Sequence, residues 1–243
     1  MPKDKLHPVK KNRPIPSGKL PVPIAVFTIA FLFFITLFVS YNISFFFFII
    51  CLFYFVLHFS YSLWLKQIGI LDVLAIAAGF MFRIWAGAVA VDAHISVWLL
   101  LCVTSFSLFL AVAKRRCELT FLKNVATGHR QALITYPEKL LDLYTVMFAT
   151  SSWLTYALFT FSQPAANEMG KYFNFMIYLP STLIAQKWLM LTVPLVIYGV
   201  MRYLQLIYDQ GKGESPEEII LTDIPLRTDF LIWLVLLIFL IYI

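Results

Sequence analysis

Seven long apolar runs constrain this chain more than any other feature of its sequence. Each run is about 20 residues long, the length that an α-helix needs to cross the hydrocarbon core of a bilayer. Of the 243 residues, 61% are hydrophobic and 13% are charged, whereas a soluble domain carries about 25% charged residues. The sequence therefore predicts an all-α, polytopic transmembrane helical bundle. The predicted spans are 21–39, 43–61, 71–91, 95–113, 143–162, 187–208 and 226–243.

Lys and Arg are distributed asymmetrically between the two sides of this predicted bundle. If the N-terminus is cytoplasmic, only Lys171 and Lys187 fall on or near the outer side, Arg83 lies within a span, and the other 16 lie inside. Cytoplasmic loops of membrane proteins carry such an excess of basic residues. We therefore expect a multi-pass protein of the plasma (inner) membrane with a cytoplasmic N-terminus. Nucleic-acid binding is not expected, because the cations are divided among loops that separate the spans.

The longer loops lie on the predicted inner side. A basic segment, 1–20, precedes a membrane domain, 21–243, and the loops 62–70, 114–142 and 209–227 are expected to cap a site that opens to the cytoplasm. The loop between the first two spans, by contrast, is expected to be a tight turn. The three cysteines form no CxxC pair, so the sequence predicts neither a disulfide framework nor a zinc site.

Charged side chains within the spans are candidate functional groups, because a charge in the bilayer is costly. Asp72 opens the third span and Arg83 follows eleven residues later. Eleven residues are about three helical turns, so both lie on nearly one face, about 16 Å apart along the axis. Arg83 either lines an anion-binding cavity or is satisfied by carbonyls or a carboxylate within the bundle.

Two clusters of cations lie at the predicted inner boundary. Lys114, Arg115 and Arg116 follow the fourth span, and they either mark the end of the span or bind an anion. Glu118 lies four residues after Lys114, which permits an ion pair on one helix face. In the N-terminal segment HPVKKNRPIPSG, prolines separate the cations. Because Arg suits bidentate contacts to phosphate, this segment indicates a phosphate site.

The ordered set of motifs resembles the UbiA superfamily of intramembrane prenyltransferases. The pattern D-x-x-H-P-x-K-x-x-R-P-x-x-S-G, from Asp4 to Gly18, is similar to the end of the first aspartate motif of that superfamily. The resemblance implies nine helices, of which the predicted spans would be the third to the ninth. Because the match begins inside the first motif, without its N, D and second D, we hypothesise a truncated open reading frame.

Further stretches are similar to the decaprenyl-phosphate phosphoribosyltransferase branch of the superfamily. They include YSLWLKQIGILDVLAIAAGFMFRIWAGAVA and WLLLCVTSFSLFLAVAKRRCEL. In the second stretch, KRRCEL occupies the position of the second aspartate-rich motif of the enzymes that prenylate aromatic acceptors. The stretch from Arg130 to Asp142 and the pattern around Gly213, Pro216, Glu217 and Asp223 extend the resemblance to essentially the whole chain.

The resemblance implies an enzyme that moves the 5-phosphoribosyl group of phosphoribosyl pyrophosphate onto a polyprenyl (decaprenyl) phosphate and releases pyrophosphate, for cell-wall arabinan precursor synthesis. It also implies Mg²⁺ as cofactor, with Asp4 as its ligand. The implied catalytic residues are Asp4, Lys66, Arg116 and Glu118. The implied substrate-binding residues are Lys10, Arg13, Asp72, Arg83, Lys114, Arg115, Tyr136 and Asp142.

Three alternatives stay open beside this interpretation. A UbiA-type enzyme for an aromatic acceptor would carry a second DxxxD motif where this chain has KRRCEL. An inactive truncated homologue would account for the missing part of the first motif. A transporter or channel would show broken helices and an inverted repeat, which the sequence does not. The lipid chain length and the oligomeric state also stay open, with a homo-oligomer as one alternative.

Overall fold

The computed structural model describes residues 14–15, 17–124, 137–163, 187–210 and 216–242. Within these residues the secondary structure is helical and contains no strand, which confirms the predicted all-α bundle. The long helices are α2 (Val22–Ile43), α3 (Phe45–Leu63), α4 (Gly69–Ala90), α5 (Val97–Asn124), α7 (Glu138–Ser162), α9 (Val193–Gln210) and α11 (Ile224–Tyr242). The short elements are η2 (Leu65–Gln67), η4 (Trp188–Thr192) and α10 (Pro216–Thr222).

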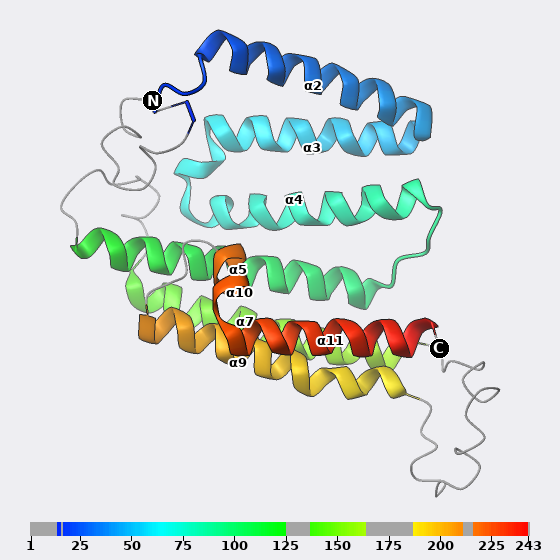
Figure 1. Cartoon of the computed structure of the whole chain (residues 1–243), viewed down its shortest axis with the longest axis vertical. Helices are drawn as coiled ribbons and strands as arrows, with labels where there is room; N and C mark the ends of the chain where they lie inside the picture. The colour runs from blue at the N-terminus through cyan, green and yellow to red at the C-terminus, as the bar shows by residue number, and fades with distance from the viewer. Residues whose placement is uncertain (1–13, 16, 125–136, 164–186, 211–215, 243) are drawn as a thin grey trace, which may run out of the picture.

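The helices form a row that continues into a cluster. In Figure 1, α2, α3, α4 and α5 lie side by side, each packed against the next along the chain. The remaining long helices gather at the α5 end of the row, where α7 packs on α5, α9 on α7, and α11 on α9. Because neighbouring helices run in opposite directions, residues from alternate helix ends meet at the same end of the bundle.

Six of the described helices are long and apolar enough to cross a membrane. They include α2 to α5, the η4–α9 segment and α11, so the chain is a multi-pass membrane protein. The predicted span at 143–162 corresponds to α7, which lies outside this set of six. Its polar side chains Thr145, Ser152 and Thr160 are buried, so α7 turns a polar stripe toward its neighbours.

The turn predicted at residues 40–42 is wrong. Those residues belong to α2, and the chain reverses at Ser44, whose backbone is extended at φ −164° and ψ 146°. The Ser40 hydroxyl donates to the Leu37 carbonyl at 2.9 Å, and the Asn42 amide donates to the Phe38 carbonyl at 2.7 Å. Such bonds to the preceding turn satisfy polar side chains within a helix, so a short polar stretch was not sufficient to end it.

The cap loop predicted at 114–142 is also partly wrong. Helix α5 continues through the three cations to Asn124, and α7 already begins at Glu138. The predicted end of the fourth span at residue 113 assumed that the three cations at 114–116 face water. Two of them, Arg115 and Arg116, instead have carboxylate partners inside the bundle. The predicted loop 209–227 likewise contains α10 and the first turn of α11.

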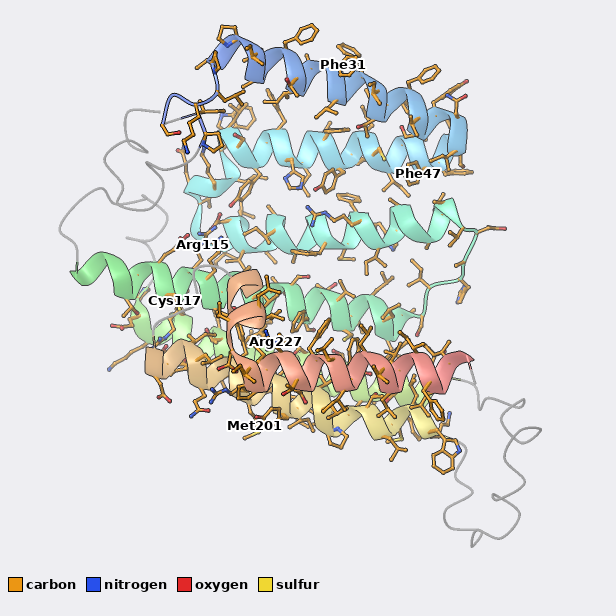
Figure 2. All side chains as sticks on the ribbon, in the orientation of Figure 1. Phe31, Phe47, Arg115, Cys117, Met201 and Arg227 are labelled. Carbon is orange, nitrogen blue, oxygen red and sulfur yellow. The ribbon has the colours of Figure 1, made fainter. Side chains whose placement is uncertain are left out.

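The buried core lies around α5. One cluster of buried side chains joins α5 to α7, α9, α10 and α11 around Phe109 and Ile207, both fully buried. A second joins α4, α5 and α7 around Val112 and Leu141. By contrast, α3 has no buried residue and α2 has only Ala25 and Ser40. The apolar side chains of this edge, such as Phe31 in Figure 2, are therefore exposed.

Candidate functional site

Charged side chains gather at one end of the bundle, which we call the basic end. It is the end at which α3 and α9 finish and α4, α7 and α11 begin, on the left in Figure 1. The first turn of α4 and the last third of α5 contribute charges there, and so do the first turns of α7 and the last turns of α9. These residues are Asp72, Arg115, Arg116, Glu118, Asp142, Arg202 and Asp223.

Arg115 lies at the centre of a buried network from three helices. Its Nε donates to Asp72 Oδ2, and its Nη2 donates to Asp72 Oδ1 at 3.2 Å. Its Nη1 donates to Glu118 Oε2 at 2.5 Å. The Tyr61 hydroxyl of α3 donates to Asp72 Oδ1 at 2.9 Å and accepts from Arg115 Nη2 at 3.3 Å. We call Tyr61, Asp72, Arg115 and Glu118 the Arg115 cluster.

Burial determines which members of the Arg115 cluster can meet a ligand. Asp72 is 0% exposed and Arg115 is 2% exposed, whereas the Glu118 side chain is 18% exposed. The spacing permits an ion pair between Glu118 and Lys114, but Glu118 instead pairs with Arg115. A buried arginine in a bidentate pair gains strong charge-assisted hydrogen bonds, and the loss of either partner would leave the other charge buried without compensation.

Arg116 forms a second network on the other side of α5. Its Nε donates to Asp142 Oδ1 at 2.7 Å, and its Nη1 donates to the Ile207 carbonyl at 3.3 Å. Its guanidinium carbon lies 3.9 Å from the centre of the Tyr208 ring, whose hydroxyl donates to Asp142 Oδ1 at 3.0 Å. Adjacent helical residues point about 100° apart, so Arg115 reaches toward α4 while Arg116 reaches toward α7 and α9.

A third ion pair at the basic end joins α9 to the start of α11. Arg202 Nη2 lies 2.7 Å from Asp223 Oδ2, and its Nε donates to Asp223 Oδ1 at 3.2 Å. Asp223 Oδ1 also accepts the Leu226 backbone N–H at 2.9 Å. This carboxylate therefore caps the N-terminus of α11 and holds it against α9.

Arg83 lies apart from the basic end. Its Nε and Nη2 donate to the Tyr54 hydroxyl at 3.1 and 2.7 Å, and its guanidinium carbon lies 5.1 Å from the Phe80 ring centre. It lines a cavity of about 240 Å³ between α2, α3 and α4, together with Thr36 and Cys51. Among the described residues its hydrogen bonds go to the Tyr54 hydroxyl, and none of the described carboxylates lies within 4 Å. A role of Arg83 in binding an anion stays a prediction.

The remaining candidate residues divide into two groups. Lys66, in η2, and Lys114 are half-buried, and no carboxylate among the described residues lies within 4 Å of either amine. Among the described candidate residues at the basic end, these two lysines are therefore the cations that are available to bind an anion. Asp4, Lys10, Arg13 and Tyr136 lie outside the described residues.

Three contributors to these networks escaped the sequence analysis. Tyr61, Tyr208 and Arg202 occupy apolar or amphipathic helix stretches, where a tyrosine or a boundary arginine is ordinary. Only their helix partners reveal their roles. One feature of the sequence could have indicated Tyr61. It lies eleven residues before Asp72, at the end of the helix that precedes α4, so a turn between the two helices can bring the two side chains together.

The described carboxylates do not form a ready-made metal cage. No group of three or more His, Cys, Asp or Glu side chains suited to a metal occurs among the described residues. Glu118 and Asp142 are the partly exposed carboxylates of the two arginine networks, with side chains 18% and 38% exposed. Mg²⁺ is commonly held by one or two carboxylates and the phosphates of a substrate, so this donor set fits a metal that arrives with a polyphosphate.

Known proteins match nearly the whole chain. The family model described as "UbiA prenyltransferase family" matches residues 1–219. A decaprenyl-phosphate phosphoribosyltransferase of Mycolicibacterium smegmatis is 31% identical over 233 residues, which are 95% of this chain and 70% of the relative. Its namesake in Corynebacterium glutamicum is 28% identical over 99% of this chain and 68% of the relative. The decaprenyl-phosphate phosphoribosyltransferase of Mycobacterium tuberculosis is 26% identical over 95% of this chain and 70% of the relative. These matches confirm the resemblance that the motifs indicated.

Proposed function

Because this chain belongs to the UbiA prenyltransferase family, we propose that it transfers the 5-phosphoribosyl group of phosphoribosyl pyrophosphate to a polyprenyl phosphate, decaprenyl phosphate by its relatives' names. A phosphate oxygen of the lipid forms a bond to C1 of the ribosyl group, and the bond from C1 to the pyrophosphate oxygen breaks. Pyrophosphate leaves with the bonding electrons. The product would enter the synthesis of cell-wall arabinan precursors.

The observation that carries this proposal is the pair of arginine networks at one end of a membrane bundle. The donor is a water-soluble polyanion and the acceptor is a lipid with an anionic head, so they meet where the bilayer ends. Cations fixed at that boundary stabilise charge that develops on a leaving pyrophosphate. The networks occupy the KRRCEL stretch, where enzymes for aromatic acceptors would carry aspartates.

The proposal gives the two groups of candidate residues different tasks. Lys66 and Lys114, with Lys10 and Arg13 of the N-terminal segment, contact phosphate groups of the donor and the lipid. Arg116 stabilises the leaving pyrophosphate, and Asp142 fixes its guanidinium.

The lipid and the outer part of the donor meet other residues. Glu118 contacts the donor, and Tyr136 belongs to the cap above it. The cavity beside Arg83 accommodates part of the lipid.

Members of the family generally use divalent metal ions, and we propose Mg²⁺ for this chain. Asp4 and the phosphates of the donor would hold the ion. When bound, the ion would neutralise charge on the pyrophosphate group. The basic end accordingly faces the cytoplasm of the plasma membrane, where the donor and the metal are available.

The proposal is tested by supplying membranes that contain the chain with radiolabelled phosphoribosyl pyrophosphate, Mg²⁺ and a polyprenyl phosphate. We expect a labelled lipid, and we expect Arg116→Ala to lower its rate of formation about 100-fold. Arg227→Ala is the matched control, because Arg227 is an exposed cation at the same end and should leave the rate unchanged.

A positive reference makes a negative result meaningful. Membranes that contain the Mycolicibacterium smegmatis relative should form labelled lipid under the same conditions. If they do so while membranes with this chain form none, the proposed transfer is contradicted. Equal losses in Arg116→Ala and Arg227→Ala would instead reject the role of Arg116.

A further inference from the structure

We propose that Tyr61, Asp72 and Arg115 are positioning residues whose task is to hold the Glu118 carboxylate against the ribosyl hydroxyl groups of the donor. This inference rests on the proposed function and deepens it. It replaces the substrate-binding roles that the sequence implied for Asp72 and Arg115, and it adds Tyr61, to which the sequence gave no role.

Burial separates the charged members of the Arg115 cluster into two that are sealed from solvent and one that is partly exposed. Asp72 is 0% exposed and Arg115 is 2% exposed, so neither can contact a substrate without abandoning its partners. Glu118 is the charged member whose side chain reaches the surface, with 18% of it exposed, and the uncharged Tyr61 is half-buried. Any influence of the two buried charges on a substrate therefore passes through Glu118.

The guanidinium geometry explains how that influence is transmitted. Arg115 presents its Nε and Nη2 edge to the two oxygens of Asp72, which fixes the plane of the group. The remaining nitrogen, Nη1, then points at Glu118 Oε2. A planar fork held along one edge cannot rotate, so the direction of the Glu118 contact is set by Asp72 on the neighbouring helix.

Tyr61 completes the cluster from α3. Its hydroxyl donates to Asp72 Oδ1 and accepts from Arg115 Nη2, so it closes a triangle with the bidentate pair. Because α3 has no buried residue, this hydroxyl links the exposed edge of the bundle to the cluster. Loss of the hydroxyl alone changes neither charge nor ring volume, so Tyr61→Phe loosens Asp72 and Arg115 gently.

The chemistry of a carboxylate indicates which part of the donor Glu118 meets. An ionised carboxylate only accepts hydrogen bonds, and it repels the phosphate groups of phosphoribosyl pyrophosphate. The ribosyl hydroxyls are the hydrogen-bond donors of that molecule. A carboxylate fixed in direction at the basic end therefore recognises the sugar, while the available lysines recognise its phosphates.

A double-mutant cycle tests whether Tyr61 acts through Glu118. We expect Glu118→Gln to lower kcat/KM for the donor about 30-fold and Tyr61→Phe to lower it about fivefold. In the double variant, Tyr61→Phe should add less than about twofold to the loss, because its route through Glu118 is already removed. The KM for the lipid phosphate should stay unchanged, since the cluster does not contact the lipid.

The controls separate positioning from a general loss of structure. Tyr41→Phe removes an exposed hydroxyl at the other end of the bundle and should not change kcat/KM. Arg115→Lys keeps the charge without the fork, and it should resemble Glu118→Gln in its donor kcat/KM while the protein still elutes as a folded species in detergent.

Two results would overturn the inference, and they are distinguishable from failure of the proposed function. Multiplicative losses in the double variant would show that Tyr61 acts independently of Glu118. A parallel rise in the KM values for donor and lipid would show a loosened bundle. By contrast, a wild-type chain that forms no labelled lipid beside an active relative rejects the transfer reaction, and this inference with it.

Discussion

Two neighbouring arginines on one helix carry out separate structural tasks at the residue scale. Arg115 turns toward Asp72 of α4 and is sealed from solvent, while Arg116 turns toward α7 and α9 and stacks on Tyr208. A run of three cations therefore does not act as one positive patch. It distributes its charges among different carboxylates, and of the three only the Lys114 amine has none within 4 Å among the described residues.

Loss of the Asp72 charge should destabilise the protein. Among the described residues, Asp72→Asn leaves the buried Arg115 guanidinium with only the Glu118 carboxylate as a charged partner. We expect a loss of about 3 kcal/mol in the free energy of unfolding. The measurement is the thermal midpoint of the purified protein in detergent, followed by helical circular dichroism. Asp92→Asn is the matched control, because Asp92 is exposed and has φ 52°, a conformation that Asn also tolerates. Equal midpoints for the two variants would contradict the buried pair.

The polar residues show what sequence reasoning could and could not find at this scale. The cations of KRRCEL and the acid at the start of α4 stand out against apolar neighbours, so their involvement was predictable. Their partners were not predictable, because Glu118 has two cations within one turn, and it pairs with Arg115 rather than with Lys114. That choice depends on the position of Asp72, which belongs to another helix and leaves no trace in the local pattern.

At the scale of elements, close packing between α9 and α11 depends on a glycine. A Cβ atom added to Gly199 would lie 3.0 Å from Asp229 Oδ2 and 4.0 Å from Leu226 Cδ1. Both of those residues are buried in α11, so neither side chain has open space to move into. Small residues at helix contacts allow such an approach in membrane proteins.

A larger side chain at Gly199 should therefore force the two helices apart. We expect Gly199→Leu to lower the free energy of unfolding by about 1–3 kcal/mol through overpacking. Gly87→Leu is the control, because Gly87 is exposed and nothing lies within 4 Å of its added Cβ. Thermal midpoints in detergent distinguish the two variants, and a loss in Gly87→Leu as large as in Gly199→Leu would reject the packing argument.

Helix positions were predicted more reliably than helix ends. Every predicted span coincides with a long helix, because bilayer thickness sets a minimum apolar length that the sequence displays directly. The ends of α2 and α5 were misplaced, since Ser40, Asn42 and the basic run at 114–116 were taken to face water. In the folded chain Ser40 and Asn42 bond to carbonyls of their own helix, while Arg115 and Arg116 bond to carboxylates of other helices. The partners on other helices are invisible to a count of hydropathy.

At the scale of the whole molecule, the distribution of cations predicts the orientation in the membrane. Lys139 is exposed near the start of α7 at the basic end, and Asp92 is exposed in the turn after α4 at the opposite end. If the basic end is cytoplasmic, these two positions lie on opposite sides of the membrane.

Cysteine labelling checks this orientation. In intact cells, we expect a membrane-impermeant maleimide to label Asp92→Cys and to label Lys139→Cys only after permeabilisation. The native Cys51, Cys102 and Cys117 lie within spans and are half-buried or buried, so the unsubstituted chain serves as the background control. Labelling of Lys139→Cys in intact cells would reverse the assigned orientation.

The row of α2 to α5 also has a consequence for biosynthesis. Each of these helices packs on its neighbour in sequence, so they can associate in the order in which the ribosome delivers them. The Arg116 bond to the Ile207 carbonyl instead joins residues 91 positions apart, and it must wait until α9 has been synthesised and inserted. The Arg116 network is therefore completed only after α9 is in place, whereas the Arg115 cluster needs only α3, α4 and α5.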